Sequence, residues 1–248
     1  MTYCVAINVE EGLVMLSDTR TNAGVDNISR FRKMFTWEEP GERAIVLMTA
    51  GNLSITQGIV TRIQSQLDRY LLGETTETIM SAASLHGAAE LIGQAMREMQ
   101  ATHGRAVAAQ GISAGASLIL AGQRRGGRPR IFLIYSAGNF IEATRDTPFL
   151  QIGEHKYGKP ILDRVITPQT SLVDAVNAAV VSMDSTIKSN LSVGMPLDLA
   201  VLPRDALKFS VRRRIEAQDD EYRAVSAAWG EGLLEAFANL PDYLPAAQ

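Results

Sequence analysis

The sequence predicts an α+β protein of four layers, an αββα sandwich in which two antiparallel β-sheets pack face to face and are flanked by helices. The prediction rests on the order of the hydrophobic patterns along the 248 residues. Four strand-like runs precede two helical stripes, and strands, one helix and more strands follow. This order differs from the strand–helix alternation of a parallel sheet. Each sheet would bury one face against the other sheet and its second face against helices.

The first four strands follow from apolar runs separated by turn residues. Residues 2–10 (TYCVAINVE) alternate between polar and apolar, and EEG separates them from LVMLSD at residues 13–18. This pattern predicts a hairpin. The runs at 33–37 and 43–50, which are separated by EPGE, predict the next two strands.

Three helices are predicted from apolar side chains at spacings of three and four residues. A stripe with a strict spacing of four indicates a helix over 52–72: Ile55, Ile59, Ile63, Leu67 and Leu71. A second stripe indicates a helix over 79–102: Leu85, Ala89, Ile92, Met96 and Met99. A third helix is expected over 171–190, where Ser171 caps the start and Asp174 follows three residues later.

The remaining apolar runs complete the two sheets and add a final helix. Strands are expected at 116–122, 130–138, 197–202 and 208–215, and a last helix carries Val225, Trp229, Leu233 and Phe237. We therefore expect one domain over residues 1–203. Residues 204–248 would form a C-terminal extension, a strand plus a helix, that serves assembly.

Composition excludes several classes of function. The 24 Lys and Arg against 27 Asp and Glu give a net charge of −3, so no nucleic acid partner is expected. No apolar run approaches the ~18 residues of a membrane span and the start lacks a signal-peptide pattern, so we expect a cytoplasmic protein without a membrane partner. One cysteine and three histidines without ligand spacing predict no metal and no cofactor.

Thr2 is the first candidate for a catalytic residue. Removal of Met1 would leave Thr2 with both a hydroxyl and a free α-amine. An α-amine has a pKa near ~7.7–8.0, so at neutral pH it can accept the hydroxyl proton. One residue would then hold both a nucleophile and its base.

Three further positions give Thr2 a context. Asp18 closes the second strand in SDTR, Lys33 opens the next strand in FRKMF, and Gly51 lies where a strand meets a helix. With Thr2, this pattern resembles the proteasome β-subunit family of N-terminal nucleophile (Ntn) hydrolases over roughly residues 2–203. The MTYCV start, the segment FLQIGEHKYGKPILDR and the extended C-terminus resemble a bacterial subgroup of that family.

The resemblance implies a role for each matching residue. Thr2 would be the nucleophile, Asp18 and Lys33 a buried charged pair, and Gly51 the donor to the oxyanion. A Lys33 ammonium near the α-amine would lower the pKa of that amine and favour its basic form. Ser192 would match a serine of the family's D-x-x-S-G element, and the specificity pocket would be lined by Thr49 and Leu53.

Two positions depart from the family pattern. Glu154 stands where the family has a serine, and Ser189 replaces an aspartate. A carboxylate at position 154 could pair with Lys33 or with the α-amine, or raise the pKa of the amine and weaken catalysis. We regard both residues as possible modulators of the site.

The resemblance also implies partners and leaves one alternative function open. We expect a threonine-type peptidase or amide hydrolase that assembles with itself into a ring or an open helical array. Its substrate would be a peptide or another amide, and an unfoldase or biosynthetic partner is conceivable. The alternative is a proteasome-like scaffold with weak or lost catalysis.

A rival catalytic motif is present at residues 111–115. GISAG matches G-x-S-x-G, and Asp146 and His155 follow in the order that α/β-hydrolases use. That motif requires a strand before the serine and a helix after it, whereas GISAG follows a polar segment and precedes a strand-like run. We expect His86 and His103 to be solvated or satisfied histidines, and Cys4 to be a small buried hydrophobe.

Overall fold

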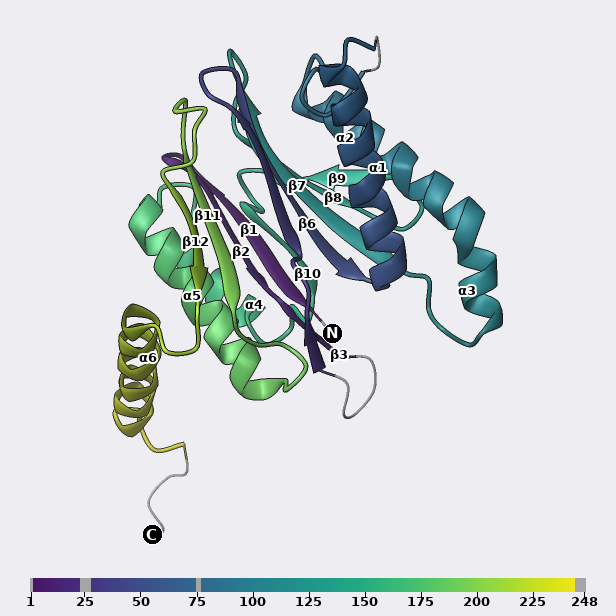
Figure 1. Ribbon diagram of the computed structural model, residues 1–248. Coiled ribbons are helices and arrows are strands. Elements are labelled where there is room, and N and C mark those ends of the chain that lie inside the picture. The colour runs from purple at the N-terminus through teal and green to yellow at the C-terminus, as the bar shows by residue number, and fades with distance from the viewer. Residues whose placement is uncertain (1, 23–27, 75–76, 244–248) are drawn as a thin grey trace.

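The computed structural model of the protein describes residues 2–22, 28–74 and 77–243, and two five-stranded antiparallel sheets form its centre. The sheets pack face to face, and helices cover both outer faces (Figure 1). The four-layer αββα architecture expected from the order of the hydrophobic patterns is confirmed.

The first sheet is built around the N-terminal hairpin. Its strand order is β10 (Phe149–Gly153), β1 (Tyr3–Val9), β2 (Gly12–Asp18), β11 (Leu197–Pro203) and β12 (Val211–Ile215). The hairpin register pairs Cys4 with Ser17, so the start of β1 lies beside the end of β2. β12, the strand of the expected C-terminal extension, is the edge strand of this sheet.

The second sheet contains the strands on either side of the two central helices. Its order is β5 (Met34–Glu39), β6 (Arg43–Gly51), β7 (Ala116–Arg124), β8 (Arg130–Ile134) and β9 (Phe140–Glu142). A separate two-stranded ribbon, β3 (Arg20–Asn22) and β4 (Ile28–Arg30), lies between β2 and β5 in the chain.

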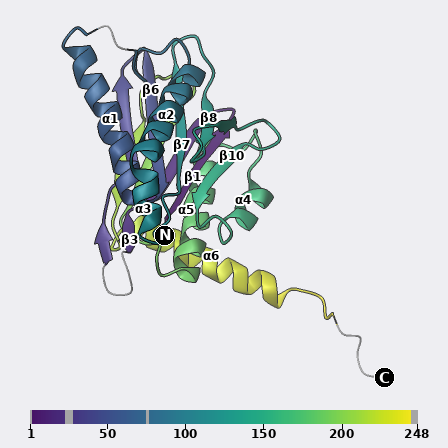
Figure 2. The ribbon, with the colours of Figure 1, turned by 90° about the vertical axis from the view of Figure 1, so that its right-hand side faces the viewer.

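Helices α1 (Leu53–Leu71) and α2 (Leu85–Met99) cover the second sheet (Figure 2). They run in opposite directions, because Gly58 near the start of α1 faces the side chain of Met99 at the end of α2. Arg62, in the middle of α1, forms a salt bridge with Glu98 of α2. A π-helical turn, η1 (Gln100–Gly104), leads from α2 into the short α3 (Arg105–Ala109).

The first sheet is covered by α4 (Lys159–Val165) and α5 (Leu172–Ser189), and α6 (Asp220–Ala238) packs on the outside of α5 (Figure 1). Ser171 caps α5 as expected, since its Oγ accepts a hydrogen bond from Asp174 N at 3.1 Å. No helix within the described ranges is long and apolar enough to cross a membrane.

Three layers of buried side chains hold the elements together, one under each set of helices and one between the sheets. Along each strand, residues that point into the layer between the sheets alternate with residues that point toward the helices. The members of the layer between the sheets include Cys4, Ala6, Met15, Val46, Met48, Ile119 and Ala200.

The structure corrects some of the expected boundaries. The second helix begins at Leu85 instead of residue 79, because Ser84 has an extended backbone and its Oγ accepts from Gly87 N at 3.0 Å. The buried Ile79 and Ala82 belong to the preceding turns. β3, β4, β9, β10 and α4 were not predicted, because segments of three to seven residues carry too little periodicity.

Truncation of Ile119 tests the layer between the sheets. We expect Ile119→Ala to lower the free energy of unfolding by about 2–5 kcal/mol, because it opens a cavity in a fully buried layer. The matched change Ile141→Ala, in the same sheet but 45% exposed, should stay within about 0.5–1 kcal/mol of the wild type. Urea unfolding measures both, and equal losses would contradict the placement of Ile119.

Candidate active site

The candidate site lies at one end of the sandwich, where several strands begin or end. β1 and β5 begin at this end, and β2, β6 and β10 finish there (Figure 1). Thr2 precedes β1, Asp18 ends β2, Lys33 precedes β5 and Gly51 ends β6. Antiparallel pairing thus brings residues that are distant in the chain to the same end of the molecule.

A buried ion pair is the centre of this end. Lys33 Nζ lies 2.7 Å from Asp18 Oδ1, and the two side chains are 5% and 0% exposed. Lys33 Nζ also donates to the carbonyl oxygen of Arg20 at 2.5 Å. Asp18 Oδ1 accepts a hydrogen bond from Tyr3 N at 3.1 Å, so the pair lies directly beneath the residue that follows Thr2. The contact predicted between Asp18 and Lys33 is therefore present.

Burial is the largest influence on the pKa of Asp18, and it raises that pKa. The Lys33 ammonium and the hydrogen bonds from the N–H groups of Tyr3 and Gly194 lower it and so oppose the effect of burial. A buried pair of charges is costly to desolvate. Such pairs are concentrated at functional sites, where charge is arranged for chemistry.

Thr2 is fixed by the end of β10. Its side chain is buried, and its carbonyl oxygen accepts a hydrogen bond from Glu154 N at 2.7 Å. Gly153 has a φ of +83°, and a Cβ there would lie 1.8 Å from the Thr2 carbonyl oxygen, so only glycine fits. The mostly buried carboxylate of Glu154 lies 3.8 Å from Lys156 Nζ. Met1 lies outside the described residues.

Gly51 has a backbone conformation that favours glycine and lies against the segment around Gly115. Its φ is +103°, and a Cβ would lie 2.3 Å from the carbonyl oxygen of Gly115. The same oxygen accepts from Asn52 N at 2.8 Å, and the Asn52 side chain caps α1. Leu53, a predicted pocket residue, is the first residue of α1 and is half-buried.

Thr49 connects the two sheets at this end. Its N–H donates to the carbonyl oxygen of Lys33 at 2.9 Å, and its own carbonyl oxygen lies 3.8 Å from Cys4 Sγ. Thr49 is buried. Gly51 follows Thr49 by two residues in β6, and Thr2 precedes Cys4 by two residues. The contacts of Thr49 therefore join the segment that holds Gly51 to the segment that follows Thr2.

The loop between α5 and β11 closes the site from another side. Gly194 N lies 3.4 Å from Asp18 Oδ2, and Ser192 N donates to Asn190 Oδ1 at 2.9 Å. Ser192 is half-buried, whereas Ser189 is the exposed last residue of α5.

Sequence reasoning missed two residues that hold this loop. Arg20 Nη1 donates to the carbonyl oxygen of Leu191 at 2.9 Å, and a Cβ at Gly194 would lie 2.4 Å from the Arg20 guanidinium carbon. Arg20 belongs to the SDTR element that marked Asp18, and Gly194 follows Ser192 by two residues. Neither spacing by itself reveals that the two residues touch.

The rival G-x-S-x-G motif has the wrong surroundings. Ser113 lies in a loop after α3 and before β7, which is the reverse of the strand–serine–helix order of a hydrolase elbow. Its Oγ accepts from Gly115 N at 3.1 Å and its carbonyl oxygen accepts from Asn52 Nδ2 at 3.0 Å. The loop therefore braces the turn at Gly51.

Cys4, His86 and His103 are placed as expected. Cys4 is fully buried, and burial raises the pKa of its thiol, which disfavours the nucleophilic thiolate. His103 and His155 are exposed, and His155 Nδ1 lies 3.2 Å from the carbonyl oxygen of Gly153. His86 is half-exposed beside Glu90 and the ring of Phe140. Within the described ranges, no three His, Cys, Asp or Glu residues gather as metal ligands would.

Neutralising Asp18 tests the buried pair. We expect Asp18→Asn to lower the free energy of unfolding by about 3–5 kcal/mol, because it removes the negative charge beside a buried ammonium. The control Asp163→Asn breaks the exposed pair with Lys159 and should cost less than about 1 kcal/mol. Denaturant unfolding checks both, and a loss no larger than that of the control would contradict a buried, charged pair.

Comparison with known proteins agrees with this geometry. The family model described as "Proteasome subunit" matches residues 2–202. No curated protein matches the chain. Anbu (ancestral beta-subunit) from Yersinia bercovieri is a solved structure with 44% sequence identity and a TM-score of 0.90, over 99% of this chain and 100% of that one.

Two further solved structures are similar over nearly the whole chain. Anbu from Hyphomicrobium sp. strain MC1 is 46% identical, with a TM-score of 0.86 over 98% of this chain and 100% of that one. The helical assembly of the Anbu complex from Pseudomonas aeruginosa is 43% identical, with a TM-score of 0.91 over 99% of this chain and 100% of that one. The chain therefore belongs to the proteasome subunit family, and the members that it resembles over its whole length are Anbu proteins.

Proposed function

We propose that the protein is an N-terminal threonine amide hydrolase, with Thr2 as its nucleophile after removal of Met1. The observation that carries the proposal is the buried Asp18–Lys33 pair, which is hydrogen-bonded to the residue after Thr2. Membership of the proteasome subunit family supports it. A buried charged pair is costly to desolvate, and at this position its charge would act on the protonation of the neighbouring α-amine.

The reaction follows from the groups present. The α-amine of Thr2 takes the proton of its own hydroxyl, and Oγ attacks the carbonyl carbon of the substrate amide. The N–H of Gly51, at the end of β6, stabilises the resulting oxyanion. The C–N bond then breaks as the amine passes the proton to the leaving nitrogen, and water hydrolyses the ester on Thr2. Lys33 lowers the pKa of the α-amine, so the amine is a free base near neutral pH.

Surrounding residues would set the substrate specificity and the basicity of the α-amine. Thr49 and Leu53, at the end of β6 and the start of α1, would line the pocket for the substrate side chain. Ser192 would support the amine from the loop that contacts Asp18 through Gly194. Glu154, whose N–H bonds to Thr2, would tune the pKa of the amine, and Ser189 would have an indirect influence from the end of α5.

The same proposal includes self-assembly in the cytoplasm. An Anbu relative from Pseudomonas aeruginosa forms a helical assembly, and the C-terminal extension of this chain contains helix α6, whose second half has exposed apolar side chains. A free, buried Cys4 suits a reducing compartment. An unfoldase or biosynthetic protein would deliver the peptide or amide substrate.

A scaffold without catalysis is the second candidate, and the departure at Glu154 is the observation that favours it. A carboxylate beside the α-amine would hold the amine in its protonated form and so block the base. The backbone N–H of Glu154 donates to the Thr2 carbonyl oxygen at 2.7 Å, which holds this residue next to Thr2, and its carboxylate lies 3.8 Å from Lys156 Nζ.

Substitution of Thr2 separates the two candidates. Intact mass should show a chain that lacks Met1, and a peptide epoxyketone should add once to it. We expect Thr2→Ala to lose this adduct, because the hydroxyl is the attacking group, while Thr2→Ser retains it.

Two control variants identify the nucleophile. Cys4→Ala and Ser113→Ala should both react like the wild type, because Cys4 is buried as a thiol and Ser113 belongs to a supporting loop. Retained Met1 together with the absence of any adduct would favour the scaffold. An adduct on Thr2→Ala would move the nucleophile elsewhere.

A further inference from the structure

Helix α6 is firmly attached at one half and projects at the other. The buried Asp184 of α5 accepts hydrogen bonds at Oδ1 from Tyr222 Oη at 2.9 Å and from Ser226 Oγ at 2.7 Å. Lys188 Nζ lies 3.0 Å from the second oxygen of the same carboxylate. These contacts fix the direction of the helix, so its free half is held in position before any partner binds.

The free half has an apolar stripe with an acidic border. Leu233, Leu234 and Phe237 are 50%, 73% and 75% exposed. Glu231 and Glu235 lie one turn apart on the side next to this stripe. The chain has no Lys or Arg after Arg223, so this end of the protein is uniformly acidic.

A basic groove lies at the other edge of the sandwich, between the edge strands β5 and β12. Its volume is about 470 Å³. Four arginines and one aspartate line it, and that aspartate, Asp198, is already bound by Arg214 at 2.8 and 3.0 Å. The exposed Arg32 and Arg212 leave the groove positively charged, and Met34, Leu199 and Ala200 form its apolar floor.

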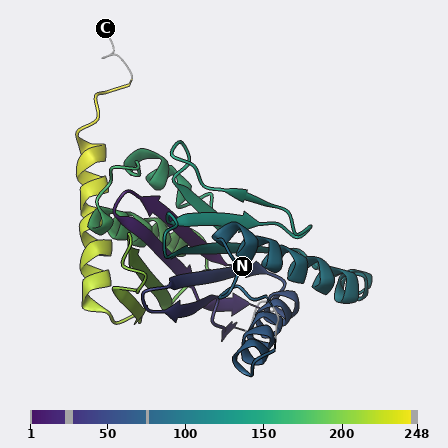
Figure 3. The ribbon, with the colours of Figure 1, turned by 90° about the horizontal axis from the view of Figure 1, so that it is seen from above.

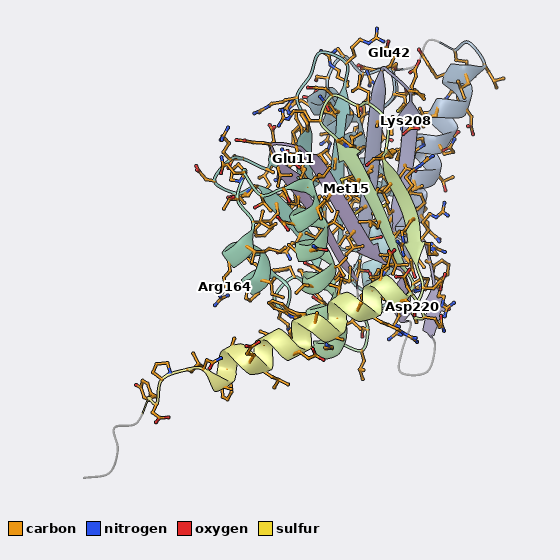
Figure 4. All side chains as sticks on the ribbon, turned by 90° about the vertical axis from the view of Figure 1, so that its left-hand side faces the viewer. Glu11, Met15, Glu42, Arg164, Lys208 and Asp220 are labelled. Atoms are coloured by element: carbon orange, nitrogen blue, oxygen red, sulfur yellow. The ribbon has the colours of Figure 1, made fainter. Side chains whose placement is uncertain are left out.

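The free half of α6 and the groove between β5 and β12 lie at opposite edges of the molecule. α6 begins beside β12, runs along the outside of α5 and ends beyond the edge that α4 and β10 form (Figures 2, 3 and 4). A second copy placed against that edge in the same orientation would present its own β5 and β12 edge to the end of α6. One copy cannot use its own groove, because its helix points away from it.

We propose that residues 231–243 of one copy dock into the groove between β5 and β12 of the next copy. The apolar stripe would cover the floor of the groove, and Glu231 and Glu235 would face Arg32 and Arg212. This head-to-tail contact uses different surfaces on the two partners, so it continues into a ring or an open helix depending on the rotation between copies. The inference rests on the proposed self-assembly and names the surfaces that carry it.

Charge reversal on each surface tests the contact. We expect a helix variant (Glu231→Arg with Glu235→Arg) and a groove variant (Arg32→Glu with Arg212→Glu) each to raise the concentration needed for assembly by about tenfold or more. An equimolar mixture of the two variants should assemble again, because each reversed surface then meets its complement. Sedimentation velocity at low salt measures the species present.

Control reversals and cross-linking make the result specific. Glu42→Lys and Lys208→Glu, at the end of the molecule far from α6, should assemble like the wild type (Figure 4). A chain with Phe237→Cys and Thr36→Cys should give disulfide-linked ladders, whereas Val173→Cys with Thr36→Cys should not.

The outcomes separate the docking contact from assembly itself. Wild-type assembly that persists in both charge-reversed variants, or that yields no ladder with the cysteine pair, would overturn the docking contact and leave self-assembly intact. A mixture of variants that fails to assemble would also overturn it. A wild type that remains a 26.9 kDa monomer at micromolar concentration would refute self-assembly and the docking contact together.

Discussion

The buried ammonium of Lys33 is the constraint on which the candidate site depends. A charge with 5% of its side chain exposed is tolerable because a carboxylate lies at 2.7 Å and the carbonyl oxygen of Arg20 accepts a further hydrogen bond. Asp18 is in turn held by the N–H groups of Tyr3 and Gly194. Satisfying one buried cation therefore fixes the start of β1, the end of β2 and the loop before β11, and these same segments surround Thr2.

Close backbone approach is the second requirement at this end of the molecule. Gly153 lies against the Thr2 carbonyl and Gly51 against Gly115, both with positive φ. A side chain at either position would push apart strands that must meet for the site to exist. The Ser113 loop, which carries a hydrolase-like motif, serves this packing through Asn52 and contributes no nucleophile of its own. The GISAG segment therefore has a structural role, which its match to the G-x-S-x-G pattern does not indicate.

The same fold leaves apolar surface uncovered in one region. The first half of α6 is secured through Asp184, but the second half exposes Leu234 and Phe237 to solvent. Contiguous apolar surface of this kind is characteristic of contact with another protein. Four arginines line the groove between the edge strands β5 and β12. Charged side chains on edge strands disfavour pairing with another sheet, and here they also offer a basic surface to an acidic partner.

Hydrophobic periodicity alone determined the layered α+β class, the three long covering helices and most long strands, because each of these segments buries one face of a regular element. The positions of Thr2, Asp18, Lys33 and Gly51 were also readable, through their order and their resemblance to a family. Only the tertiary structure decided the short β10, the contact of Arg20 with the loop at Gly194, and the contact of Asn52 with Gly115. These features arise from contacts between residues far apart in the chain, or from strands too short to show a period, and local sequence does not encode which distant partner will meet them.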